Sequence, residues 1–415
     1  MVWHKAPALG IAAVLVATTV GATSAAAESS GPSRSAIARQ YQTVFLPTLS
    51  VANDWNGSVS GCNPGGTGPA YEQATLTAVN YMRGLADLPA VSFDAALNSK
   101  SQSAALIMTA QGNLDHHPPQ SWACWTEAGY DAASHSNLSL NVTGPAAIAG
   151  YMRDPGATND VVGHRRWILY SAALTMGTGS TATSNALNVI GARLLFVTPT
   201  WVAWPTQGFF PWQLEPGGRW SLSLPGADFT KASIRASVGG TPLGVNQAGV
   251  RTGIGDNTIS WQVALPAPAN PQHPADLSVD VVADGVRLAD GTMISYSYTV
   301  TLMDATAPID GAEAPGGHTV PAHPTGVVAT RNAGGIGVQW NPASDPTGQL
   351  LHYVVTGQPL GLGSRGLPRK TCRSTTSSCE LAGTSKKVLY RVTVVALNAL
   401  GPSEPMSVLS RVPRR

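Results

Sequence analysis

The pattern of apolar residues changes after Pro199, and this change restricts the folds open to the chain. Before Pro199, apolar residues recur at helical spacing in several segments. After it, short alternating runs are separated by turn dipeptides such as Asp284-Gly285. We therefore expect a helix-rich first half and a β-rich second half. The expected helices cover about 35–48, 71–85, 94–111, 145–153 and 165–169, and a strand is expected over 185–197.

A chain of 415 residues exceeds what one hydrophobic core usually organises, so we expect several domains and a multidomain α+β class. Residues 305–323 are rich in Pro, Gly and Ala, which indicates a linker. The predicted parts are a signal peptide (1–27), an N-terminal segment (28–69), a helix-rich domain (70–200), a β-sandwich (201–304), the linker and a last β domain (324–412).

The first 27 residues have the pattern of an export signal. His4 and Lys5 precede an apolar run over 8–20, and Ala25-Ala26-Ala27 provides the small residues that signal peptidase requires. The run is shorter than the roughly 20 residues of a membrane span, so a retained anchor is the weaker alternative. We expect cleavage, secretion to the extracellular space and no membrane span in the released chain.

The composition excludes one broad class of partner. Charged residues make up 12% of the chain and its formal net charge is only +2. Nucleic-acid binding needs a dense positive surface that neutralises phosphates, so no nucleic-acid partner is expected. Arginine outnumbers lysine, and Ala, Gly, Pro and Val are abundant, which is typical of a GC-rich bacterial genome.

Four cysteines in an exported chain indicate two disulfides, with three possible connectivities. We predict the pairs Cys62–Cys124 and Cys372–Cys379, because each pair then lies within one domain. Free thiols or a metal site are the alternatives. The chain has no Cys-x-x-Cys motif, which argues against zinc bound through sulfur.

Aromatic residues are concentrated just after the change of pattern. They are interrupted by prolines and lie within 201–220. A sugar-binding platform would use such residues, but packing in a core or between domains is the more common role. The aromatic positions are Trp201, Trp204, Phe209, Phe210, Trp212 and Trp220.

The last 90 residues resemble a fibronectin type III domain. The resemblance rests on Trp340, Tyr353, Tyr390 and the closing segment Asn398-Ala399-Leu400-Gly401-Pro402-Ser403. An insert that carries the last two cysteines precedes Tyr390, and we interpret it as a hairpin closed by a disulfide. A domain of this kind implies spacing or adhesion and no chemistry of its own.

Histidines gather in the helix-rich domain, at His116, His117, His135 and His164. Imidazoles serve as metal ligands and as acid–base groups, although scattered histidines also occur on ordinary surfaces. Their positions alone therefore do not identify a site.

The sequence around these histidines resembles the CAP superfamily, and most of all its bacterial SCP-like branch. The resemblance covers about residues 70–200. It rests on the order and spacing of Asn80-Tyr81-Met82-Arg83, Val91 to Leu97, Leu114-Asp115-His116, Ser136-Asn137-Leu138 and Gly163-His164-Arg165-Arg166-Trp167-Ile168-Leu169. It implies an α-β-α sandwich with a central cleft.

In this family the cleft often holds two histidines and two glutamates that bind a divalent cation. His116 and His164 occupy the histidine positions here, while Ser136 replaces the first glutamate and Asp154 stands near the second. Two imidazoles and one carboxylate still suit an ion such as zinc, with His117 and His135 as alternative ligands. The alternative is a polar cleft in which His116 and His164 are held by hydrogen bonds.

One of the two arginines after His164 is expected to pair with Asp154 or Asp160, and the other to face solvent. The missing glutamate removes a charge and a candidate general base, which favours a non-catalytic extracellular or cell-envelope protein that binds an unidentified cell-wall or extracellular ligand. A metal-dependent hydrolase that acts on peptidoglycan or peptides is the second hypothesis. An adhesin or carbohydrate-binding arm formed by the β domains is the third.

Overall fold

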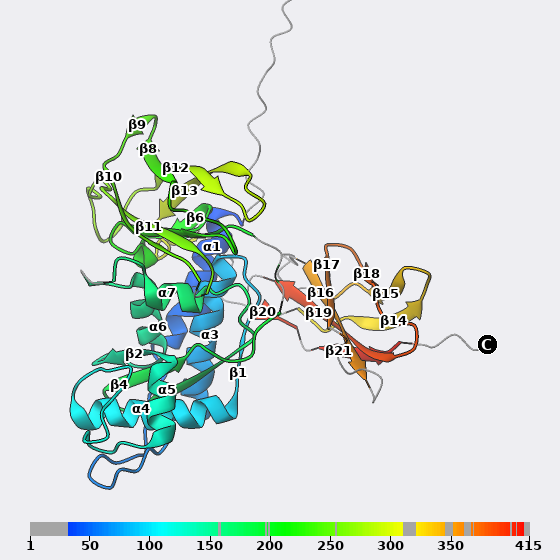
Figure 1. Ribbon diagram of the computed structural model, residues 1–415. Helices are drawn as coiled ribbons and strands as arrows, with labels where there is room; N and C mark the ends of the chain where they lie inside the picture. The colour runs from blue at the N-terminus through cyan, green and yellow to red at the C-terminus, as the bar shows by residue number, and fades with distance from the viewer. Residues whose placement is uncertain are drawn as a thin grey trace, which may run out of the picture. The chain divides into compact units, whose positions relative to one another are not determined.

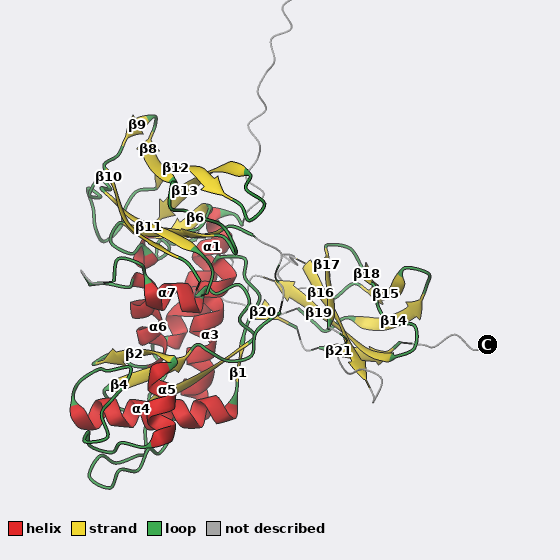
Figure 2. Ribbon diagram, in the orientation of Figure 1, coloured by secondary structure: helices red, strands yellow, loops and turns green. Residues whose placement is uncertain are grey.

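The computed structural model describes residues 32–410, apart from 157–158, 196, 198–199, 254, 310–320, 345–351, 361–366, 368, 399–400 and 404. The predicted signal peptide and most of the predicted linker lie outside the described residues. The multidomain α+β class is confirmed, because a helix-bearing sheet precedes several purely β sheets (Figures 1 and 2).

The first sheet has the strand order β1-β3-β4-β2. Strand β1 is parallel to β3, and the other two pairings are antiparallel. The five helices of this part are α3 to α7. The bounds are β1 (Ser92–Phe93), β2 (Ser136–Leu140), β3 (Thr175–Ser180), β4 (Ser184–Asn188), α3 (Pro69–Leu85), α4 (Ala95–Gln111), α5 (Glu127–Ser134), α6 (Gly144–Arg153) and α7 (Gly163–Ile168).

Helices cover both faces of this sheet, as the resemblance implied. Adjacent residues of β4 point to opposite faces, so Ala186 packs with the buried residues of α4 and α5, whereas Leu187 packs with those of α3, α6 and α7. The sheet is therefore the middle layer of an α-β-α sandwich.

Local signals set the ends of α4. The Asp94 side chain accepts hydrogen bonds from the backbone nitrogens of Ala96 and Leu97, and Gly112 ends the helix in the left-handed conformation with φ 66°. Both signals were read from the sequence and are confirmed. The expected strand over 185–197 was too long, because β4 ends at Asn188.

Helix α4 lies unusually close to β3. A Cβ atom added to Gly179 would lie 2.1 Å from the backbone nitrogen of Gln102, and one added to Gly177 would lie 2.4 Å from the Leu97 side chain. Only glycine permits this approach of helix backbone to strand backbone.

An N-terminal helical segment precedes the sandwich. It comprises α1 (Arg34–Gln40), a π-helical turn (Tyr41–Phe45) and α2 (Leu46–Thr48), so the expected helix over 35–48 is confirmed. Its buried Phe45 ring stacks on Tyr81 of α3 with ring centroids 5.1 Å apart.

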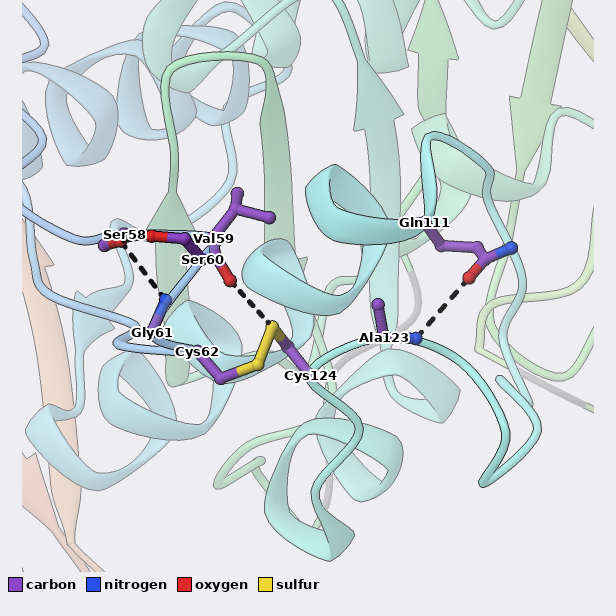
Figure 3. Close-up of a disulfide and its surroundings, with 8 residues drawn as sticks. All are labelled: Ser58, Val59, Ser60, Gly61, Cys62, Gln111, Ala123 and Cys124. Carbon is purple, nitrogen blue, oxygen red and sulfur yellow. Dashed lines mark hydrogen bonds between the residues drawn. A yellow bond between two sulfur atoms is a disulfide. The ribbon is translucent and has the colours of Figure 1, made fainter.

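Both predicted disulfides form. Cys62, in the loop before α3, is bonded to Cys124, in the loop before α5 (Figure 3). Cys372 is bonded to Cys379. The first bridge closes a separation of 62 residues, and such a loop contributes roughly 4 kcal/mol in the chain-entropy model.

The segment after residue 200 forms two further sheets, with orders β10-β11-β7-β5 and β6-β13-β12-β8-β9. Strand β13 is antiparallel to β12 and parallel to β6. The strands are β5 (Val202–Trp204), β6 (Gly208–Pro211), β7 (Arg219–Ser223), β8 (Ser233–Val238), β9 (Thr241–Pro242), β10 (Val245–Arg251), β11 (Thr258–Val263), β12 (Leu277–Arg287) and β13 (Met293–Met303).

We call residues 201–304 the middle sandwich. Its buried apolar residues belong to one continuous cluster with those of α3, α6 and α7. Trp204, Phe210 and Trp220 are fully buried in that cluster, and the other aromatic residues of 201–220 are partly buried. The aromatic residues therefore serve core packing, which weakens the sugar-platform hypothesis for this stretch.

Asp304 sits at the end of the middle sandwich and is 3% exposed. Burial raises its pKa, but hydrogen bonds from Thr306, His273 and Gln213 outweigh this and lower the pKa from 3.8 to about 2.

We expect Asp304→Asn to change the acid stability of the protein. A lowered folded-state pKa stabilises the fold above pH 3.8, and this contribution is lost as the pH falls towards 2. The difference in thermal midpoint between wild type and variant should therefore be largest above pH 5 and become smaller below pH 4. A difference that stays constant from pH 6 to pH 2 would contradict this assignment.

The last domain is described by itself. One sheet has the order β14-β15-β18, and the other has the order β17-β16-β19-β20, with β21 also paired to β19. Trp340, Tyr353 and Tyr390 are buried in its core. The strands are β14 (Thr325–Arg331), β15 (Gly335–Asn341), β16 (His352–Leu360), β17 (Lys370–Ser374), β18 (Ser378–Ala382), β19 (Leu389–Asn398), β20 (Gly401–Pro402) and β21 (Met406–Leu409).

The second disulfide differs from the expected hairpin closure. Cys372 belongs to β17 and Cys379 to β18, and these strands are in different sheets. The bridge therefore connects the two layers of the sandwich.

Candidate functional site

The centre of the candidate site is a hydrogen bond between His164 and Asp154. Asp154 caps the end of α6 in the left-handed conformation with φ 51°, and His164 is the second residue of α7. The His164 Nδ1 atom lies 2.7 Å from Oδ1 of Asp154. The carboxylate is completely buried, whereas the imidazole side chain is 31% exposed.

Three donors use the two oxygens of Asp154. Oδ1 accepts from His164 and from the side-chain amide of Asn159, and Oδ2 accepts from the backbone nitrogen of Arg165 at 3.2 Å. Because a carboxylate only accepts hydrogen bonds, Nδ1 of neutral His164 carries its proton, and Nε2 has a free lone pair. We call Asp154, Asn159 and His164 the His164 site.

Asn137 of β2 and Tyr151 of α6 hold His164 in place. The side-chain amide of Asn137, in β2, donates to the carbonyl of His164 at 3.0 Å. The buried Tyr151 hydroxyl donates to the carbonyl of Asn137, and its ring lies 5.5 Å from the His164 ring, centroid to centroid. Burial raises the pKa of Tyr151, so its hydroxyl stays protonated as a donor.

Sequence reasoning did not assign Asn137, Tyr151 or Asn159 to the site. Asn137 stands beside Ser136 in a segment that the family resemblance already singled out. Asn159 carries no local pattern that marks it.

The other predicted residues do not join this group. Nδ1 of His116 lies 3.0 Å from the carbonyl of Ala133, at the end of α5. Ser136 is buried, and its hydroxyl donates to the carbonyl of Ala132 at 2.6 Å. Both side chains therefore bind the end of α5.

The two alternative ligands also lie elsewhere. Nδ1 of His135 contacts the carbonyl of Asp131 at 2.7 Å, within the same helical turn. His117 is exposed, with its ring 6.0 Å from that of Tyr130.

The described residues do not gather into a group that could hold a metal. Within the described part of the chain, no three His, Cys, Asp or Glu side chains group closely enough to hold an ion. Tetrahedral zinc sites need at least three protein ligands, and the oxygens of Asp154 already face three N–H donors. Zinc binding by His116, His164 and Asp154 stays a prediction from the family resemblance.

Neither arginine after His164 faces solvent, which corrects the expectation that one of them would. Arg165 is completely buried and Arg166 is 8% exposed. Arg166 donates to the Thr258 hydroxyl and the Asp256 carbonyl, so it binds the middle sandwich. Burial lowers the pKa of each guanidinium to about 10, so both remain charged at neutral pH.

Two described cavities lie away from the His164 site. One, of about 450 Å³, is lined by residues of β14 and β15 together with Thr376, Ser377 and Ser378. The other, of about 280 Å³, is lined by residues at the start of α3 together with Thr67 and Phe93. No predicted site residue lines either cavity.

Comparison with protein families identifies two parts of the chain. Residues 76–197 match the model of the cysteine-rich secretory protein family, CAP. Residues 322–409 match the model of the fibronectin type III domain. The chain therefore contains a CAP domain and a C-terminal fibronectin type III domain, which confirms both resemblances at this level.

Comparison with solved structures found fibronectin type III domains. A human collagen alpha-1(XX) domain is 26% identical, with 25% of this chain and 96% of that chain covered at a TM-score of 0.19. A two-domain segment of chicken tenascin is 13% identical, with 46% and 91% covered at a TM-score of 0.19. No curated protein matched the chain. No helix of the described residues is long and apolar enough to cross a membrane.

Proposed function

We propose that this chain is a secreted binding protein of the cell envelope or extracellular space, and that its His164 site contacts the ligand without catalysing a reaction. The CAP and fibronectin type III domains and the two disulfides fit an extracellular protein. The observation that carries the proposal is the saturated carboxylate of Asp154, which serves to fix His164.

The arrangement suits a hydrogen-bonding contact. Asp154 and the Tyr151 ring hold the imidazole in one orientation, and in its neutral form the ring offers the Nε2 lone pair to a ligand hydroxyl or amide N–H. A fixed side chain loses little conformational entropy on binding, so such a contact adds to affinity. Peptidoglycan is rich in hydroxyl and amide groups and is our proposed ligand class.

The second candidate function is hydrolysis of the same material. A buried aspartate that orients a histidine through Nδ1 is the base-and-orienter pair of many hydrolases, and this observation favours the candidate. His164 would then take a proton from an attacking water at Nε2. The step uses only residues of this chain and requires no metal.

We expect His164→Ala to weaken binding to soluble peptidoglycan fragments by about tenfold, the effect of one lost hydrogen bond of about 1.4 kcal/mol. Isothermal titration calorimetry on the mature chain measures this effect. His117→Ala is the matched control, because His117 is exposed and lies outside the His164 site.

Recovery of the ligand separates the two functions. Intact fragments after long incubation support the binding protein, whereas new fragments formed by wild type and not by His164→Ala support the hydrolase. Equal affinity of wild type and His164→Ala, with intact fragments, would remove the His164 site from both functions.

A further inference from the structure

One arginine of the middle sandwich contacts the backbone of the His164 site. Arg219 is the first residue of β7. Its Nη1 atom lies 3.1 Å from the carbonyl oxygen of Asp154, 2.7 Å from that of Gly156 and 3.4 Å from that of Asn159. A single guanidinium therefore contacts Asp154 and Asn159, two of the three residues of the His164 site.

Two residues in or beside the His164 site have a left-handed backbone conformation. Asp154 has φ 51° and Val162 has φ 47°, a conformation that is unfavourable for a β-branched residue such as valine and less so for aspartate. Such conformations cost about 1 kcal/mol or more each and persist only where surrounding contacts hold them. The contacts from Arg219 are made at the first of these two positions.

Other atoms of the middle sandwich hold the same segment. The Ser260 hydroxyl, in β11, donates to the carbonyl of Asp160. In return, Nη1 of Arg165 donates to the carbonyl of Arg219 at 2.8 Å. The start of β7 and the residues around the His164 site therefore fix each other's position.

We infer that Arg219 is a positioning residue of the His164 site, and that the middle sandwich completes that site. The inference rests on the proposed role of His164 as the ligand-contacting group. Arg219 holds the carbonyls of Asp154 and Asn159, the Asn159 amide donates to the Asp154 carboxylate, and that carboxylate accepts from Nδ1 of His164.

The test is the exchange rate of the His164 Nδ1 proton, measured by NMR at one pH on the 15N-histidine-labelled mature chain. The resonance is assigned by its loss in His164→Ala. We expect this proton to exchange with water about tenfold faster in Arg219→Gln, because a local opening that is easier by about 1.4 kcal/mol exposes it more often.

Two further variants control the measurement. Arg235 forms an exposed ion pair with Asp284 in the same sandwich, so Arg235→Gln should leave the exchange unchanged. Arg219→Lys keeps a charged donor on a shorter side chain and should give an intermediate rate. Arg219→Lys also supplies the readout if Arg219→Gln does not fold.

Unchanged exchange in folded Arg219→Gln would overturn the positioning role. Faster exchange in Arg219→Gln, with weaker binding of peptidoglycan fragments, supports the inference in full. Faster exchange in Arg219→Gln, with no binding by the wild type, supports the positioning role and contradicts the proposed function.

Discussion

Gly179→Ala is expected to lower the free energy of unfolding by about 3 kcal/mol or more, at the upper end of what overpacking costs. The new methyl group would lie 2.1 Å from the backbone nitrogen of Gln102 and 2.3 Å from its Cα atom. These are atoms of the α4 backbone, so no side-chain rotation relieves the contact. Helix α4 must move away from β3 as a unit, and its buried face loses contact with the sheet.

The matched control is Gly84→Ala, in the exposed part of α3. A Cβ atom added there meets nothing within 4 Å, and alanine in a helix is favoured over glycine by about 0.5–1 kcal/mol. Urea unfolding of both variants should therefore give shifts of opposite sign. A Gly179→Ala protein as stable as wild type would show that α4 does not approach β3 this closely.

The sequence was sufficient for features that depend on neighbouring residues. The cap at Asp94 and the stop at Gly112 act within one helical turn, so they were predicted correctly. The long strand expected over 185–197 was wrong, because the apolar pattern continues beyond Asn188 while the described residues there pair only through an isolated bridge between Arg193 and Ala173. Pairing of strands depends on distant residues, which a local pattern does not contain.

The role of Gly179 shows the same limit. Glycine is required at this position because the backbone of α4 at Gln102, 77 positions earlier, lies against it. No pattern around residue 179 indicates that contact. The aromatic stretch was ambiguous for a related reason, since only the folded chain shows that Trp204 and Trp220 are buried.

Individual residues of the candidate site could be predicted from the sequence, but not which of them lie together. The family resemblance singled out His116, Asp154 and His164, and the structure brings only the last two together. The Ser136 side chain is short, and its hydroxyl donates to the carbonyl of Ala132 near the end of α5. Arg219 carried no signal, because it lies outside the segment that matches the CAP family model.

Arg165→Ala is expected to destabilise the protein by about 4 kcal/mol, as expected when one partner is removed from a buried charged network. Arg165 is completely buried, and its guanidinium donates to the carbonyls of Met152, Arg153 and Arg219 and to the Ser221 hydroxyl. Alanine leaves these acceptors without their donor and opens a cavity between α6 and β7. Urea unfolding measures the loss.

Two variants decide whether the hydrogen bonds of the Arg165 guanidinium or its charge alone stabilise the protein. Arg165→Lys keeps the charge but lacks a planar set of donors for four acceptors, so it should recover less than half of the loss. Arg235→Ala removes an exposed arginine and should change stability by no more than about 0.5 kcal/mol. A loss below about 1 kcal/mol in Arg165→Ala would mean that the shared apolar core alone holds the CAP domain and β7 together.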